Sequence, residues 1–131
     1  MAKLTEEQQE FLRQPYFAVA TTIRKDGSPH NTVVWVDVED DGTPSFNTAL
    51  HRAKAKHVER TPVAALTVID PTFYKWIALE GRAELTTDDA EAQIDRLAQK
   101  YDGSDGYQGR TPDMVRVKVR IDPEHVTAYG F

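Results

Sequence analysis

The stretch YFAVATTIRKDGSPHNTVVWVDV, residues 16–38, decides the fold of this chain. Two segments rich in β-branched and aromatic residues, Tyr16 to Arg24 and Asn31 to Val38, flank the sequence Lys25-Asp26-Gly27-Ser28. Asp-Gly at the centre of a short connection favours a tight turn between antiparallel strands. The stretch therefore predicts a β-hairpin.

Five later segments also have the composition or the alternation of strands. Residues 63–69 are continuously apolar, which favours a central strand, and residues 115–121 alternate strictly with period two. Gly81 lies inside a long strand pattern, where glycine indicates a bulge or a bend at a barrel corner. The five predicted strands are 44–49, 63–69, 74–85, 115–121 and 125–130.

Three short helices are expected between these strands. Thr5 and Gln8 have the spacing of a capping box, and Pro15 and Pro62 end the first two helices. The expected helices follow Thr5, lie within 48–60, and extend from 87–90 to about Tyr101. Six or seven strands with mostly hairpin links predict a single domain, residues 1–131, built as a small, largely antiparallel β-barrel.

Composition excludes several classes of protein. The chain has 131 residues, a net charge of −5 and no cysteine. An acidic balance argues against a dedicated nucleic-acid binder, and the lack of cysteine fits the reducing cytoplasm. No window is long and apolar enough to span a bilayer or to act as a signal sequence, so we expect neither membrane insertion nor secretion.

One short segment is basic in spite of the overall acidic charge. It is TALHRAKAKHVER, residues 48–60. Arg52, Lys56 and Arg60 recur at intervals of four, which is typical of one exposed helix stripe. Lys54 instead falls between Leu50 and Val58, on the side that Ala53 shares and that is expected to face the core.

A buried ammonium group needs an anionic partner, and none is placed locally. The junction Asn47-Thr48-Ala49 leads from a strand into the helix, where free N–H groups favour an anion. A ligand phosphate or carboxylate and a lysine that extends to solvent are both open interpretations. Trp35 and Trp76 are suited to a planar ring, although core or dimer-interface packing explains each equally well.

Familiar catalytic motifs are absent from the sequence. The four histidines, His30, His51, His57 and His125, lack a paired metal-ligand spacing. Neither a G-x-S-x-G motif nor a phosphate-binding glycine loop occurs. This pattern favours an enzyme whose cofactor carries the chemistry while the protein supplies position and environment.

Four segments in order, residues 20–36, 41–49, 52–71 and 76–85, resemble the pyridoxamine 5′-phosphate oxidase-like split β-barrel superfamily. They resemble more narrowly its actinobacterial branch of flavin- and deazaflavin-dependent oxidoreductases that use coenzyme F420. The resemblance implies a mainly β, Greek-key split barrel with short helices. It also implies a homodimer with a cofactor in each groove between the subunits.

The resemblance also implies a set of cofactor-binding residues. Thr48, Arg52, Ala53 and Lys54 would contact the cofactor phosphate and tail. The strand Thr32, Val33, Val34 and Trp35 would form the wall beside the ring, and Asn47 would line the same groove. Lys75 and Trp76 would reach the groove from the partner subunit. An acidic polyglutamate tail would attract Lys56 and Arg60.

The implied activity is hydride transfer from reduced F420 to an unsaturated or conjugated small molecule. One alternative is an enzyme that uses flavin mononucleotide (FMN) on the same scaffold. Another is a non-catalytic protein that binds or sequesters F420. No spacing fixes a catalytic residue, and Tyr74, Tyr107 and solvent are all open as the proton donor.

Overall fold

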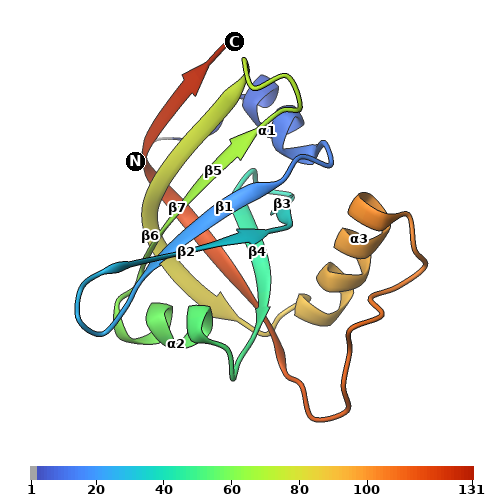
Figure 1. Cartoon of the computed structure of the whole chain (residues 1–131). Coiled ribbons are helices and arrows are strands. Elements are labelled where there is room, and N and C mark those ends of the chain that lie inside the picture. The colour runs from blue at the N-terminus through green and yellow to red at the C-terminus, as the bar shows by residue number, and fades with distance from the viewer. Residues whose placement is uncertain (1–2) are drawn as a thin grey trace.

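Seven strands and three helices make up the computed structural model, which describes residues 3–131 (Figure 1). The helices are α1 (Glu6–Arg13), α2 (Ala53–Arg60) and α3 (Ala90–Asp102). The strands are β1 (Ala18–Ile23), β2 (Pro29–Val34), β3 (Val36–Val38), β4 (Pro44–Ala49), β5 (Val63–Ile69), β6 (Trp76–Thr86) and β7 (Arg116–Tyr129). The predicted hairpin, capping box at Thr5 and mainly β fold are confirmed.

The sheet is closed into a barrel by the chain itself at Trp35. Its strand order is β2-β1-β5-β6-β7-β4-β3, and every neighbouring pair is antiparallel. Strands β2 and β3 lie at opposite edges of the sheet, although only Trp35 separates them along the chain. The sheet must therefore curl until its two edges meet at this residue. This arrangement confirms the split-barrel prediction and corrects the single strand predicted for 31–38.

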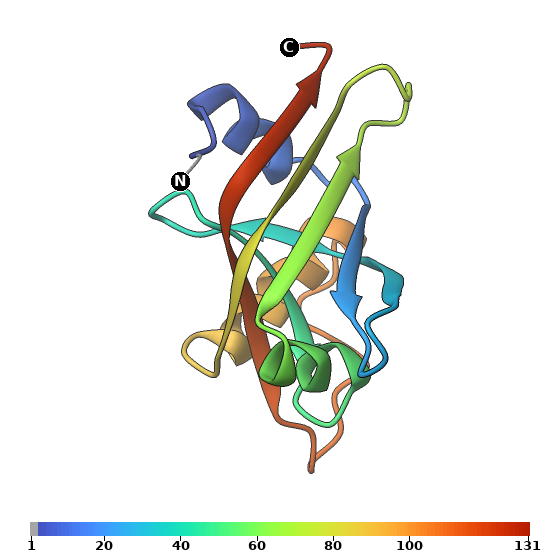
Figure 2. The same cartoon turned by 90° about the vertical axis from the view of Figure 1, so that its left-hand side faces the viewer.

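Strands β6 and β7 run side by side along the whole molecule (Figures 1 and 2). Their register shifts between Glu80 and Gly81, which confirms the predicted bulge. A Cβ atom at Gly81 would lie 2.0 Å from the carbonyl oxygen of Asp122, so only glycine fits this close approach. The strands predicted at 115–121 and 125–130 are one strand, because Pro123 lies opposite the bulge and the ladder continues past it.

The core fills the inside of the barrel. Alternate residues of β5, such as Leu66 and Val68, are buried there with Phe46 of β4 and Ile77 of β6. Helix α1 adds Leu12 to the same cluster.

Helix α3 covers the outer side of β4 and β7 (Figure 1). For this reason, Arg116 to Val119 are buried on both faces of β7, although their sequence alternates between basic residues and valine. Asp89 is the N-cap of α3 in a left-handed conformation, with φ of 64°, and its carboxylate binds Arg96 and Lys118 instead of the helix. Within residues 3–131, no helix is long and apolar enough to cross a membrane.

Candidate functional site

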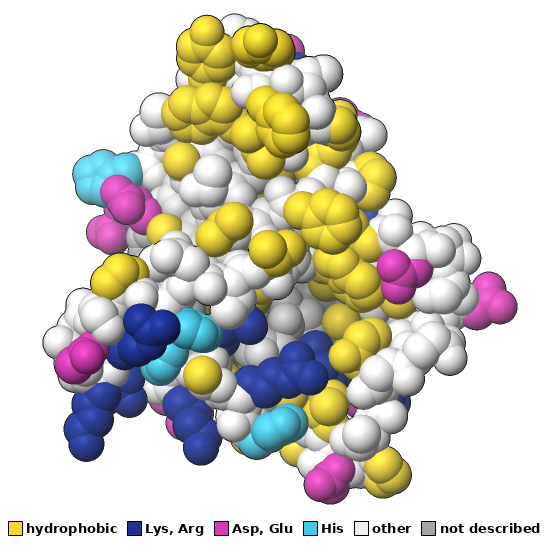
Figure 3. Space-filling model, viewed as in Figure 1, with side chains coloured by type: hydrophobic (Ala, Val, Ile, Leu, Met, Phe, Trp, Pro, Cys, Tyr) yellow, Lys and Arg dark blue, Asp and Glu magenta, His cyan; other side chains and the backbone are white. Residues whose placement is uncertain are grey.

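A cavity of about 210 Å³ opens where the barrel seam, the start of α2 and helix α3 meet. It is lined by Val33, Val34, Trp35, Asn47, Thr48, Arg52, Lys54, Ile94, Leu97, Tyr107 and Arg116. On this face of the molecule, dark blue side chains gather in the lower part around α2, and hydrophobic side chains border the hollow toward α3 (Figure 3). The cavity thus has a basic side and an apolar side.

Seven of the eleven predicted cofactor-binding residues line this cavity. They are Val33, Val34, Trp35, Asn47, Thr48, Arg52 and Lys54. Thr32 is half-buried beside them without lining the cavity, and Ala53 is exposed at the first position of α2. The structure therefore brings the strand 32–35 and the junction 47–54 to one place.

The turn from β4 into α2 sets the basic side of the cavity. The backbone N–H of Arg52 donates to the carbonyl of Ala49 at 2.9 Å, and α2 then begins at Ala53 with Arg52 as its N-cap. The first N–H groups of a helix have no acceptor within the helix, so this end attracts negative charge. The side chain of Thr48 is 1% exposed, and its hydroxyl has no hydrogen-bond partner among residues 3–131.

The prediction of how Lys54 is placed was wrong in detail. The core-facing residues of α2 are Ala55 and Val58, whereas Ala53 is exposed. Leu50 is 40% exposed and precedes the helix, so the helical spacing that linked it to Lys54 does not apply. Lys54 is half-buried because it lines the cavity rather than the core.

The cavity lining contains three cations, Arg52, Lys54 and Arg116, and no acid. Burial lowers the pKa of Lys54, and the charges of Arg52 and Arg116 lower it further. Mutual repulsion of this kind means that the three cations lie near one another. An oxyanion is the ligand group that this arrangement fits.

The apolar side of the cavity is built on the barrel seam. Val33 is exposed beside the cavity, and the Trp35 indole is stacked on Tyr101 of α3 at a centroid distance of 5.4 Å. Ile94 and Leu97 of α3 continue the apolar lining. Such surfaces suit a planar ring.

Asn47 lines the cavity, but its amide is used within the protein. Its Nδ2 donates to the Ala90 carbonyl at 2.9 Å and to Gln93 Oε1 at 3.0 Å. Its Oδ1 accepts from Arg116 Nε at 2.8 Å. Asn47 therefore ties α3 and Arg116 to strand β4.

Sequence reasoning missed three lining residues, namely Ile94, Leu97 and Arg116, and named Tyr107 only as one possible proton donor. An amphipathic helix at 90–101 must cover some face of the sheet, and this was the available signal for Ile94 and Leu97. Tyr107 lies in a glycine-rich loop, where no local pattern fixes a side chain. Its backbone N–H donates to Asp95 at 2.9 Å, and this bond, with one from Arg110, lowers the pKa of Asp95.

Lys75 and Trp76 lie at the other end of the barrel from α2, beside the β5–β6 turn (Figures 1 and 2). Lys75 Nζ lies 4.4 Å from the centroid of the Phe131 ring, and Trp76 is stacked on Tyr129. Neither lines the cavity of its own subunit. That they reach a partner's cavity stays a prediction.

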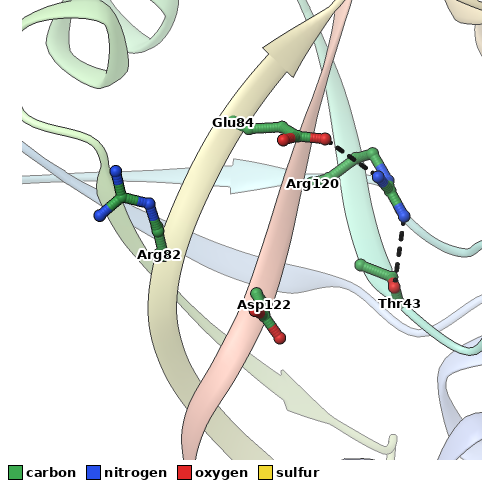
Figure 4. A pocket seen from close by; sticks show the side chains of 5 residues that line it. All are labelled: Thr43, Arg82, Glu84, Arg120 and Asp122. Carbon is green, nitrogen blue, oxygen red and sulfur yellow. Dashed lines mark hydrogen bonds and ion pairs between the residues drawn. The ribbon is translucent and has the colours of Figure 1, made fainter. Parts of the chain in front are cut away.

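A second hollow lies outside the barrel between β4, β6 and β7 (Figure 4). Its central cation, Arg120, donates to Glu84 at 2.9 Å, to Asp41 at 2.9 Å and to Thr43 at 3.4 Å. These contacts neutralise the guanidinium within the protein. Across residues 3–131, no group of three or more His, Cys, Asp or Glu side chains is arranged to hold a metal ion.

Comparison with known proteins agrees with this geometry. The chain is 31% identical over 130 residues to an F420H(2)-dependent biliverdin reductase of Mycobacterium tuberculosis. The aligned region is 95% of this chain and 87% of that protein. A pyridoxine/pyridoxamine 5′-phosphate oxidase of Pseudomonas entomophila is 33% identical over 66 residues, which are 50% of this chain and 31% of that protein.

Solved structures show the same fold. An F420 reductase superposes with a TM-score of 0.78 at 24% identity, covering 95% of this chain and 98% of the other. A conserved hypothetical protein of Mycobacterium tuberculosis superposes with a TM-score of 0.76 at 25% identity, covering 96% and 84%. The model of one family, described as pyridoxamine 5′-phosphate oxidase, matches residues 4–130. The chain therefore belongs to the pyridoxamine 5′-phosphate oxidase family.

Proposed function

We propose that this protein is an F420-dependent oxidoreductase that passes a hydride from the reduced deazaflavin to an unsaturated or conjugated small molecule. The observation that carries the proposal is one cavity with cations on one side and an apolar strand on the other. F420 combines a phosphate-bearing tail with a planar ring and so matches both sides. The 31% identity to an F420H(2)-dependent biliverdin reductase supports the choice of cofactor.

Each group of residues has a role in this proposal. Arg52 and Lys54 bind the phosphate, next to Thr48, which also lines the cavity. Residues 32–35 orient the ring, and the apolar side chains of α3 keep water from it. When bound, the deazaflavin supplies the hydride, whereas the protein binds and orients the reactants.

Tyr107 is the better placed of the two tyrosines considered as proton donors. It lines the cavity, whereas Tyr74 is 76% exposed and does not. A general acid must lie within hydrogen-bond reach of the reacting atom. Tyr107 is therefore the tyrosine that we propose as the donor, with solvent as the alternative.

A second candidate is an FMN-dependent enzyme. The partial match to a pyridoxine/pyridoxamine 5′-phosphate oxidase supports it, and the basic side of the cavity would suit the FMN phosphate equally well. A freshly purified protein that is yellow and has a flavin spectrum would favour FMN. Colourless protein that binds added F420 would favour the deazaflavin.

We further propose a homodimer in the cytoplasm. The register of β1 and β5 places Val19, Val63 and Ile69 on the outer face of the sheet, where all three are exposed. An apolar cavity of about 340 Å³ lies on the same face. A second copy of the chain would cover this surface, and Val63→Glu would then shift the molecular mass measured by light scattering from dimer to monomer.

The activity is tested with reduced F420 and a panel of quinones, enones and tetrapyrroles, by following the absorbance of oxidised F420. Turnover of at least one conjugated acceptor is expected. Tight binding of F420 without turnover of any acceptor would instead support a protein that sequesters the cofactor.

A further inference from the structure

Arg116 is a buried guanidinium without an acidic partner. Its side chain is 4% exposed. Its Nε donates to Asn47 Oδ1 at 2.8 Å, and its Nη1 contacts the sulfur of Met114 at 3.1 Å. Among residues 3–131, no carboxylate lies within salt-bridge distance of it.

The two basic residues that follow on the same face of β7 differ in this respect. Lys118 pairs with Glu39 and with Asp89, and Arg120 pairs with Glu84 and Asp41. Strand β7 therefore carries three cations at alternate positions, and Lys118 and Arg120 are neutralised within the protein. Arg116 is the one of these three that lines the cavity.

A guanidinium cannot escape this situation by losing its proton at physiological pH. Burial lowers the pKa of Arg116 and the charge of Arg52 lowers it further, whereas Tyr107 and Glu91 raise it. A buried charge is normally compensated by a partner. Because no carboxylate of residues 3–131 forms a salt bridge with Arg116, a ligand that enters the cavity can supply this partner.

The structure holds Arg116 in position for such a partner. Asn47 fixes its Nε, and Asn47 is itself fixed by Ala90 and Gln93. The Tyr107 ring covers one side of the guanidinium, with its centroid 5.1 Å from Cζ. Because a guanidinium has five N–H donors, this support leaves donors free for a ligand.

A second cation of the same cavity also lacks an acidic partner. Lys54 is half-buried, and none of the salt bridges among residues 3–131 includes it. The charge of Arg116 helps to lower the pKa of Lys54, so the two cations lie near each other. Two cations without acids in one cavity indicate an anionic oxygen ligand.

We propose that Arg116 binds an oxyanion of the ligand in this cavity, together with Lys54. The oxyanion is a phosphate or a carboxylate. The identity of the molecule that carries this group rests on the proposed function, whereas the binding of an oxyanion by Arg116 does not. A phosphate would come from the cofactor and a carboxylate from the substrate. Asn47 acts as a positioning residue for Arg116.

The first test uses inorganic phosphate and the melting temperature, at constant ionic strength set with chloride. Phosphate should raise the melting temperature of the wild type and of Arg120→Gln, which removes a cation from the same face of β7 outside the cavity. The same phosphate should raise the melting temperature of Arg116→Gln by clearly less, because only Arg52 and Lys54 remain to bind it. An equal rise in Arg116→Gln, or no rise in the wild type, would overturn the proposal.

A second variant controls for a loss of folding in Arg116→Gln. Arg116→Lys keeps the charge but loses the bond to Asn47 and the planar guanidinium. Its increase in melting temperature with phosphate should therefore lie between those of the wild type and Arg116→Gln. Repeating the melting-temperature measurement with acetate in place of phosphate distinguishes a phosphate site for the cofactor from a carboxylate site for the substrate. A rise with phosphate alone assigns the site to a phosphate, and an equal rise with acetate assigns it to a carboxylate.

The third test compares F420 with its phosphate-free deazaflavin chromophore. If Arg116 binds the cofactor phosphate, Arg116→Gln should weaken F420 about ten- to hundredfold, the range for a charge-assisted hydrogen bond. Affinity for the phosphate-free chromophore should not change. A wild type that responds to phosphate but does not bind F420 would refute the proposed function while leaving the role of Arg116 intact.

Discussion

The Trp35 indole lies parallel to the Tyr101 ring, with their planes 7° apart. Trp35 is the single residue at which the chain passes from one edge of the sheet to the other. Helix α3 therefore supports the barrel seam from outside. It also binds both backbone groups of Val36, because Tyr101 Oη accepts from the Val36 N–H at 3.1 Å and Lys100 donates to its carbonyl at 2.7 Å.

The Tyr101 hydroxyl should contribute measurably to stability. It also donates to the carbonyl of Tyr16 at 2.6 Å, so Tyr101→Phe keeps the stacked ring and removes two hydrogen bonds. We expect the free energy of unfolding in urea to fall by roughly 1–3 kcal/mol. Tyr129→Phe, on a ring that is 57% exposed, is the control and should have little effect. Equal stabilities of the two variants would contradict this role.

Lys100 should act as a structural donor rather than a surface charge. Its Nζ donates to the carbonyls of Leu12 and Val36, each at 2.7 Å, and burial lowers its pKa to about 8. Lys100→Met leaves both carbonyls without this donor, so unfolding free energy should fall by roughly 1–3 kcal/mol. Arg13→Met, on the exposed side of α1, serves as the comparison. A Lys100→Met protein as stable as Arg13→Met would refute this assignment.

Lys54 and Lys56 should differ in their effect on cofactor binding. Lys54 lines the cavity and Lys56 is exposed on the far side of α2. Lys54→Ala should weaken F420 binding about ten- to hundredfold, because it removes a charge-assisted contact worth about 1.5–3 kcal/mol. Lys56→Ala should weaken only forms with long polyglutamate tails. Unchanged F420 affinity in Lys54→Ala would remove this residue from the site.

His57 should make stability depend on pH. Burial lowers its pKa, and the nearby charges of His30, Arg60, Arg24 and Lys54 lower it further, while its Nδ1 lies 2.8 Å from Thr22 Oγ1. The folded state thus takes up a proton less readily than the unfolded state, whose pKa is near 6.5.

The sign of the effect follows from this difference. The contribution to stability is complete above the unfolded pKa and is lost as pH falls through the lower folded pKa. The free energy of unfolding of the wild type should therefore be lower below pH 6 than at pH 8. This decrease should be smaller in His57→Gln. Identical pH profiles for both proteins would contradict this prediction.

Local signals were sufficient to predict most of the fold. Asp26-Gly27 predicts the first hairpin, and Gly81 predicts the bulge that the close approach of Asp122 requires. The break at Trp35 and the continuity of β7 through Pro123 were missed. Both depend on which strands meet across the closed sheet, and this information is not local.

The site also divides into residues that local sequence signals predict and residues that only the folded arrangement reveals. A helix start next to Thr48 indicated a place for an anion, and the cations that line the cavity there include Arg52 and Lys54. Arg116 was missed because a basic residue alternating with valine is typical of a solvent-facing strand surface. Helix α3 buries that surface, and only the three-dimensional arrangement leaves Arg116 without the acids that pair with Lys118 and Arg120.

The central claim is that this cavity binds F420 in preference to FMN. The chain has two tryptophans, of which Trp35 lines the cavity. The most direct measurement is the quenching of the tryptophan fluorescence of the wild type by each cofactor. We predict saturable quenching by F420 at concentrations at least about tenfold below those needed for FMN, a gap of about 1.4 kcal/mol. Tighter quenching by FMN, or none by F420, would contradict the claim.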